Sequence, residues 1–298
     1  MPDFEKPLAD VENPEKRRYE YKDAEGKKIA DVEAEFLTVG EMIEDPASGG
    51  VVAARKLLSL KLVNPDDGRV FDVLAAFNGK GADIIVPERR IANYSHGVLG
   101  TEAIVPAPES PVDLATMLHE LGHVDQLDDP ETQGFSGFAG ISKAFMVKGG
   151  MRALGLDDVE RITTAKGHMT AVFAAIPEAR EAADPEAVAA LEAASTMEEL
   201  ETAAARLKDI LALPLRMAER DATRRALQNL RRVREESGID LLSKTLNPKE
   251  ALVSPAEGCE AATIEGLEDP DRYVAVSTVA AMKGDLKTYG AGTSRIRK

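Results

Sequence analysis

The chain has 298 residues, of which 44% are apolar, enough for one large domain or two smaller ones with a substantial core. A formal net charge of -15 argues against nucleic acid as the main partner, because phosphate binding draws its affinity from Lys and Arg. The beginning of the chain has no apolar signal segment, no stretch is apolar enough for a membrane helix, and a single cysteine, Cys259, excludes an internal disulfide and the multi-cysteine zinc patterns. These features predict an acidic cytoplasmic protein without nucleic-acid or membrane partners.

Residues 1–17 are charged and contain prolines, and we expect them to form a flexible tail. From 18 to 108, apolar and polar residues alternate at period two between turn-forming segments, a pattern typical of strands. RVFDVLAAF is expected to continue this sheet. TEAIVPAPE is a candidate for an edge strand that would bind an extended peptide by strand addition. The sequence therefore predicts a β-rich N-terminal part, mostly an antiparallel sheet.

The segment SPVDLATMLHELGHVDQ, residues 110–126, predicts a helix from 111 to about 126. Ser110 can cap its amino end, Pro111 suits the first helical position, and Asp113 lies where the acid of a capping box is found.

On that helix His119 and His123 lie one turn apart on the same face, so both imidazoles can reach one metal ion. Glu120 is rotated by about 100° from His119, which places its carboxylate beside the metal rather than on it. Zinc lowers the pKa of a bound water and polarises a carbonyl group, while a neighbouring glutamate can take up and return the proton. The three residues thus form a minimal hydrolytic set. Gly122, on the metal side of the helix, would let another backbone approach closely.

Residues 109–298 are expected to form a helical catalytic part, and 18–298 one catalytic unit. Its helices are expected near 157–176, 185–194, 197–212 and 214–236. The basic end of the chain, TSRIRK, is most simply a solvated tail.

Zinc in catalytic sites usually has three protein ligands, so a third is needed. In the helix near 214–236, Glu219 interrupts an apolar stripe formed by Leu215, Ala222, Ala226, Leu230 and Val233. A carboxylate on a buried face is costly unless it is paired or bound to metal. Asp221 is expected on the opposite side, towards solvent. The small residues Ala222 and Ala226 would let this helix pack tightly across Gly122.

HELGH with a later E-x-x-A, here residues 219–222, resembles the zincin metallopeptidases of the gluzincin type. The resemblance covers about thirty residues in two blocks. It implies that His119, His123 and Glu219 are zinc ligands and that Glu120 is the catalytic base.

Other third ligands remain open. Asp129 lies six residues after His123, where metzincin-like enzymes place theirs, and the other two histidines, His168 and His96, are also candidates. Asp125, Asp128 and Asp129 otherwise belong to a solvated helix end, from which one of them could orient a histidine. The candidates for an oxyanion stabiliser are His168, Tyr94, Tyr273 and Tyr289.

The function predicted from the sequence is a zinc-dependent peptidase with an α+β fold, comprising an N-terminal sheet, a central HExxH active-site helix and a helix-rich C-terminal half. Its partner would be a peptide or protein substrate. The alternatives are a non-peptidase metal-dependent amidase and a regulatory protein that keeps a zincin fold for binding. The sequence gives neither the cleavage specificity, nor exo- against endopeptidase action, nor the oligomeric state.

Overall fold

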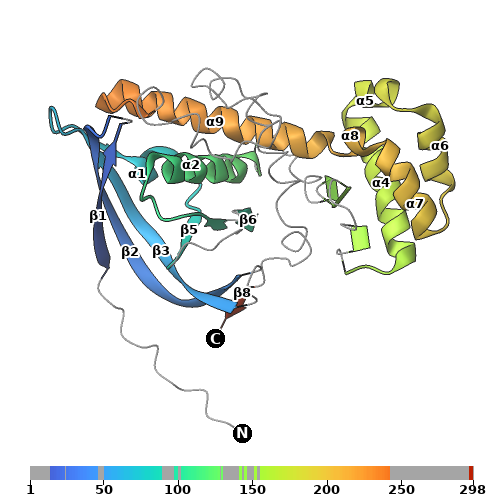
Figure 1. Cartoon of the computed structure of the whole chain (residues 1–298), viewed down its shortest axis with the longest axis horizontal. Helices are drawn as coiled ribbons and strands as arrows, with labels where there is room; N and C mark the ends of the chain where they lie inside the picture. The colour runs from blue at the N-terminus through green and yellow to red at the C-terminus, as the bar shows by residue number, and fades with distance from the viewer. Residues whose placement is uncertain are drawn as a thin grey trace, which may run out of the picture.

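The computed structural model describes an α+β protein with a mostly antiparallel sheet in its N-terminal part and helices in its C-terminal half (Figure 1). This confirms the α+β class, the mostly antiparallel N-terminal sheet and the helix-rich C-terminal half expected from the sequence. The described residues are 14–23, 25–45, 50–88, 97–99, 102–127, 129, 141–142, 144–145, 151–152, 155–241 and 295–297.

Three consecutive antiparallel strands form one side of the sheet, with β1 at its edge: β1 (Glu15–Lys22), β2 (Lys28–Asp45) and β3 (Gly50–Val63). Side chains on a strand point alternately to its two faces, and Ala30, Val32, Ala34 and Phe36 all face the core with no exposed surface. The alternation read from the sequence is therefore the pattern of one buried face. β1 begins within the segment expected to be a tail.

The remaining strands are short: β4 (Val70–Asp72), β5 (Asp83–Pro87), β6 (Gly97–Leu99), β7 (Glu102–Ile104) and β8 (Arg295–Arg297). The order is β1-β2-β3-β5-β7-β6, with β4 beside β3 and β8 beside β2, and only the β5–β7 pair of the described strands is parallel. Because β7 is paired on both sides, the expectation that TEAIVPAPE forms the sheet edge is wrong, and β6 lies at that edge. The basic end of the chain is not simply a solvated tail, since β8 pairs with β2.

RVFDVLAAF does not continue the sheet throughout, because helix α1 (Val73–Phe77) follows β4 directly. The side chain of Asp72 caps this helix by accepting a hydrogen bond from the backbone N–H of Ala75 at 3.0 Å. Val73 and Phe77, four residues apart, both face the core. An aspartate cap followed by helix-forming Leu and Ala residues thus overrides the apparent alternation.

Helix α2 (Pro111–Gln126) has the bounds and the cap that the sequence predicts. Ser110 Oγ accepts a hydrogen bond from the backbone N–H of Asp113 at 3.2 Å, and its hydroxyl donates to the Asp113 carboxylate at 2.6 Å. Leu114 and Leu118 are fully buried in the core shared with the sheet. The helix is thus fixed at its start and along one face.

Six further helices are described: α4 (Asp158–Ala175), α5 (Pro177–Ala182), α6 (Pro185–Ala193), α7 (Met197–Arg206), α8 (Lys208–Leu211) and α9 (Leu213–Ser237). They confirm the four helical regions expected from the sequence, with two differences. The region near 197–212 is divided at Leu207, and α5 is an additional short helix. None of the described helices is long and apolar enough to cross a membrane.

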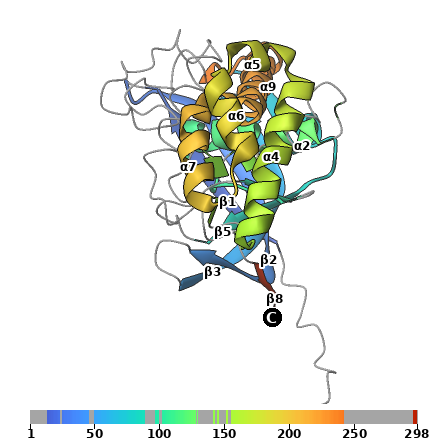
Figure 2. The ribbon, with the colours of Figure 1, turned by 90° about the vertical axis from the view of Figure 1, so that its right-hand side faces the viewer.

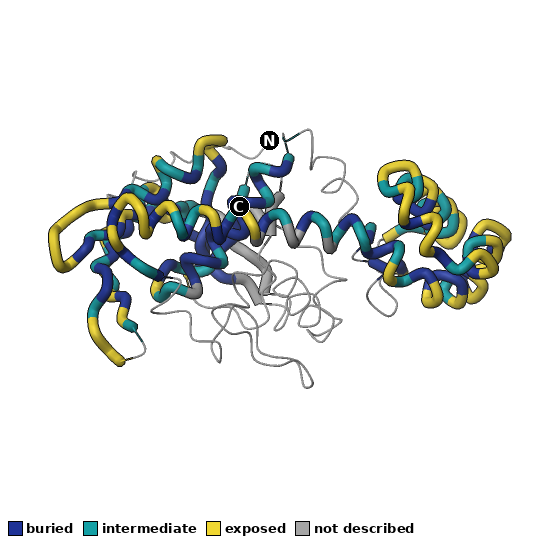
Figure 3. Tube along the Cα trace, turned by 90° about the horizontal axis from the view of Figure 1, so that it is seen from above, coloured by how far each residue is buried: buried dark blue, intermediate teal, exposed yellow. Residues whose placement is uncertain are grey.

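The buried apolar residues form two separate large cores. One joins the sheet to α1, α2 and the second half of α9, and the other lies within α4–α8 with Ala144, Phe145 and Met151. Figure 2 shows α4, α6 and α7 side by side in this second unit, which we call the helical lobe (α4–α8). α9 connects the helical lobe to the sheet part, and exposed positions gather on the outer surface of the lobe (Figure 3).

α2 lies between the sheet and α9, and the two helices run antiparallel along each other (Figure 1). Gly122 of α2 faces the backbone of Ala222 of α9. One turn later in α2, the side chain of Gln126 contacts the carbonyl of Ala218, which lies one turn earlier in α9. A Cβ atom at position 122 would lie 2.8 Å from the Ala222 carbonyl oxygen and 3.0 Å from its Cα. The sequence-based expectation of tight packing across Gly122 is therefore confirmed.

Gly122→Ala is expected to lower the free energy of unfolding by about 1–2 kcal/mol, because overpacking against a backbone outweighs the roughly 1 kcal/mol gain in helix propensity. Gly167→Ala in α4 is the matched control. A Cβ there meets nothing within 4 Å, so we expect a gain of about 0.4–1 kcal/mol. Urea denaturation of the metal-free variants measures both. A Gly122→Ala protein as stable as the wild type would contradict the close helix contact.

Candidate metal centre

His119 and His123 of α2 bring their Nε2 atoms to 3.1 Å from each other. The two rings are perpendicular, with centroids 4.7 Å apart, so they meet edge to face rather than stack. His119 is buried with 7% of its surface exposed, and His123 is half-buried. The helical spacing of four residues thus places both nitrogens at one point, as the sequence predicts.

The chemistry and separation of these two atoms fit a zinc ion. Imidazole nitrogens are common zinc ligands at about 2.0–2.1 Å, and two of them in a tetrahedral shell are roughly 3.3 Å apart. The observed Nε2–Nε2 distance of 3.1 Å needs only a small adjustment to reach that value.

Glu120 follows His119 directly in α2 and is also buried, with 6% of its surface exposed. A buried carboxylate is costly unless its position serves an interaction, and here it lies next in sequence to a histidine of the candidate centre. A carboxylate at this place can take up a proton from water and deliver it to a leaving group.

Gln126 makes contacts in two directions from the last turn of α2. Its Oε1 lies 2.9 Å from His123 Nδ1, while its Nε2 donates to the Ala218 carbonyl at 2.6 Å and to Asp221 Oδ2 at 3.1 Å. The side chain of Gln126 is completely buried. It therefore links one histidine of the candidate centre to α9.

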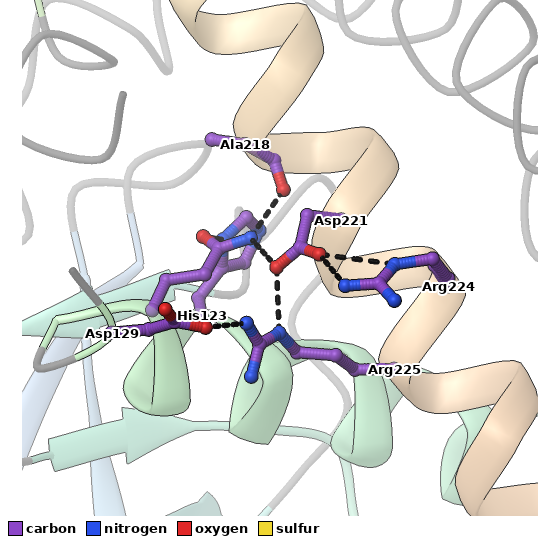
Figure 4. A network of polar contacts seen from close by, with 7 residues as sticks. His123, Asp129, Ala218, Asp221, Arg224 and Arg225 are labelled. Carbon is purple, nitrogen blue, oxygen red and sulfur yellow. Dashed lines mark hydrogen bonds and ion pairs between the residues drawn. The ribbon is translucent and has the colours of Figure 1, made fainter. Parts of the chain in front are cut away.

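Asp221 anchors the α9 end of this link (Figure 4). Its carboxylate accepts hydrogen bonds from Arg224 and Arg225, and Arg225 also pairs with Asp129, just beyond the end of α2. Burial would raise the pKa of Asp221, but the hydrogen bonds from Arg224, Arg225 and Gln126 outweigh it and hold the pKa below its usual value. The carboxylate thus stays ionised between its cationic partners.

Two features of this network differ from what the sequence predicts. Asp221 does not point to solvent, since its side chain is only 13% exposed and contacts Gln126. Gln126 itself was not identified as a functional candidate. Its signal in the sequence is its position three residues after His123, on the same helix face. One of the aspartates near the helix end could orient a histidine according to the sequence, whereas in the structure Gln126 contacts His123.

The backbone of Glu219 lies in α9, but its side chain is outside the described residues. The apolar stripe to which it belongs by periodicity is confirmed at Ala222, Ala226, Leu230 and Val233, all of which are buried. Two residues that flank position 219 contact α2. The carbonyl of Ala218 accepts a hydrogen bond from Gln126, and the backbone of Ala222 lies against Gly122. Glu219 therefore sits in the part of α9 that packs against the histidine-bearing helix.

Among the side chains that the structure describes, no three His, Cys, Asp or Glu residues form a group that could hold a metal ion. Glu219, whose side chain is outside the described residues, stays the predicted third ligand.

The alternative ligands have other surroundings. Asp129 pairs with Arg225, which favours a structural role for its carboxylate. His168 is buried within the helical lobe, where its Nε2 lies 3.0 Å from the Leu211 carbonyl oxygen and 3.2 Å from Ser142 Oγ. Burial lowers the pKa of His168, and the hydrogen bond to the Leu211 carbonyl offsets this only in part. These contacts favour a structural role for His168 within the helical lobe.

Three candidates for an oxyanion stabiliser, Tyr94, Tyr273 and Tyr289, lie outside the described residues, as do Asp128 and Cys259. Asp125 is described, and burial raises its pKa, with Arg225 and Lys80 acting in the opposite direction.

Comparisons of the chain with protein-family models, with curated proteins and with solved structures find no match.

Proposed function

We propose that the protein is a zinc-dependent peptidase in which His119, His123 and Glu219 bind the metal and Glu120 is the general base. The observation that carries this proposal is the meeting of the two histidine Nε2 atoms at 3.1 Å, beside a buried glutamate on the same helix. The substrate would be a peptide or protein. The acidic composition and the single cysteine support a cytoplasmic site of action.

A bound zinc ion would polarise the scissile carbonyl group and make water more acidic at neutral pH. The two imidazoles would hold the ion from one side because both Nε2 atoms face the same point. Glu120 would accept the proton from the attacking water and pass it to the leaving amine. Its burial excludes competing solvent from this proton transfer.

The packing of α9 supports Glu219 as the third ligand. The backbones of α2 and α9 are in close contact at Gly122 and Ala222, which resists movement of one helix along the other. A carboxylate on α9 would therefore keep a fixed position relative to the two histidines. Two histidines from one helix and an acid from another also satisfy the usual ligand number of catalytic zinc.

Metal analysis of the purified protein tests this proposal. After zinc loading and desalting, we expect about one zinc ion per wild-type chain and a strongly reduced content in His119→Ala. His168→Gln is the matched histidine control and should keep its zinc, because His168 lies in the helical lobe. Equal zinc content in the wild type and His119→Ala would refute the site.

A further inference from the structure

We propose that Gln126 is a positioning residue that fixes the tautomer of His123, and that α9 holds Gln126 in the orientation this requires. This inference rests on the proposed function, because it assigns a further residue to the same centre. It follows from which atoms of the Gln126 side chain can donate and which can accept.

The orientation of the Gln126 amide is determined by its partners on α9. The Ala218 carbonyl and the Asp221 carboxylate are both acceptors, so the amide nitrogen, which is the only donor of the side chain, must face them. The opposite orientation would bring three oxygen acceptors together in a buried place, which is costly. The oxygen of Gln126 therefore faces His123.

This orientation selects one tautomer of His123. An amide oxygen only accepts, so Nδ1 of His123 must carry the proton and donate it at 2.9 Å. Its Nε2 atom is then unprotonated, and at 3.1 Å from His119 Nε2 it can accept a hydrogen bond from that ring. Gln126 thus holds His123 in the form that binds a metal through Nε2 before any metal arrives.

The preference for this tautomer of His123 depends on how well the position of the Asp221 carboxylate is fixed. Arg224 and Arg225 both contact its carboxylate, and Arg225 is in turn held by Asp129. Gln126 is itself fully buried and so has no water with which to exchange these bonds. The tautomer of a histidine on α2 is therefore determined by side chains from α9.

The test uses nitrogen-15-labelled histidine in the metal-free protein, at about pH 8 where imidazole is neutral. NMR shifts of the ring nitrogens distinguish the two tautomers, and His→Gln variants at the other histidines assign the His123 signals. Three variants are compared with the wild type. Gln126→Met removes the acceptor with little change in size, Gln126→Glu restores it, and Gln228→Met makes the same change at an exposed position of α9. Circular dichroism reports whether each variant is folded.

In the wild type and in Gln228→Met we expect His123 to be protonated at Nδ1. Gln126→Met should show a mixture of tautomers and a zinc Kd about 10–100-fold higher, measured by competition with a chelator. Gln126→Glu should recover the Nδ1-protonated form, since a protonated carboxyl group can accept from His123 with one oxygen and donate to Ala218 or Asp221 with the other, as the amide does. If Gln126 had only a packing role, Gln126→Glu would not be expected to recover the Nδ1-protonated tautomer of His123.

A protonated Nε2 on His123 in the wild type would overturn the inference. So would a Gln126→Met protein with an unchanged tautomer and a zinc Kd within about twofold of the wild-type value. The NMR measurement needs no metal, so it is independent of the peptidase proposal. If the tautomers behave as expected but the wild type binds no zinc, the proposed function fails and the role of Gln126 stands.

Discussion

Glu120→Gln is expected to lower the rate of peptide hydrolysis by about 10²–10⁴-fold, the range typical for the loss of a positioned general base. Glutamine has nearly the same shape as glutamate but cannot accept a proton at neutral pH. The variant should keep the fold and the zinc, because the residue is not assigned as a ligand. The loss would therefore be in proton transfer alone.

The measurement compares cut sites in a peptide library derived from a proteome, treated with wild-type protein or with Glu120→Gln, with the zinc content of both determined in parallel. Glu178→Gln, on the short helix α5 of the helical lobe, is a control for the same chemical change at an exposed position and should cut as the wild type does. If Glu120→Gln cleaved the library at the wild-type rate, the assigned base would be wrong. This comparison would also identify the preferred cleavage sequence.

Glu219→Ala is expected to have the second large effect, on zinc binding. Losing a direct ligand should weaken binding by more than the roughly 10–100-fold typical of residues that only support a ligand. Hydrolysis should fall in proportion to the lost zinc at low metal concentration. Zinc Kd values from chelator competition measure the first effect, and rates at increasing zinc concentration measure the second.

Asp129→Asn is the matched control, because Asp129 is the acidic alternative closest to the histidines in sequence and pairs with Arg225 in the structure. Its loss should weaken the anchoring of Asp221 but leave all three proposed ligands in place. If Asp129→Asn lost its zinc while Glu219→Ala kept it, the metzincin-like arrangement would be favoured over the one proposed.

The parts of the structure that the sequence predicts well are those set by local chemistry. Ser110, Pro111 and Asp113 define the start of α2 within a few residues, and the spacing of His119 and His123 alone is enough to bring two nitrogens together. The contact between Gly122 and Ala222 was also predictable, since a glycine that weakens its own helix implies a close neighbour.

The parts that the sequence does not predict depend on contacts between distant segments. A helical wheel of α9 shows one apolar face and places Asp221 opposite to it, which predicts that Asp221 is exposed to solvent. In the structure a second side of α9 is covered as well, because Gln126 in the last turn of α2 contacts Asp221. The sequence predicts a solvated helix end at Asp125, Asp128 and Asp129, from which one could orient a histidine, but it is the neutral amide of Gln126 that contacts His123. The pairing of β7 on both sides likewise depends on strands that periodicity alone cannot order.

The division of the helices between two cores also depends on contacts between distant segments. α4–α8 are rich in Ala and α9 is richer in Arg, but both regions contain the Ala and Leu residues of a buried face, so their sequences do not distinguish which of them pack on the sheet. The structure assigns the second half of α9 to the core that contains α2, and α4–α8 to a core of their own. This separation explains how nearly one hundred residues can lie between His123 and position 219 without disturbing the contact between α2 and α9.

The most direct test of the metal centre is a crystal structure of the zinc-loaded protein, with the metal located by its anomalous scattering. We expect one zinc ion bound by Nε2 of His119, Nε2 of His123 and a carboxylate oxygen of Glu219, each at about 2.0–2.2 Å. Zinc elsewhere in the chain, or at the two histidines with the Glu219 carboxylate out of coordinating reach, would contradict the account.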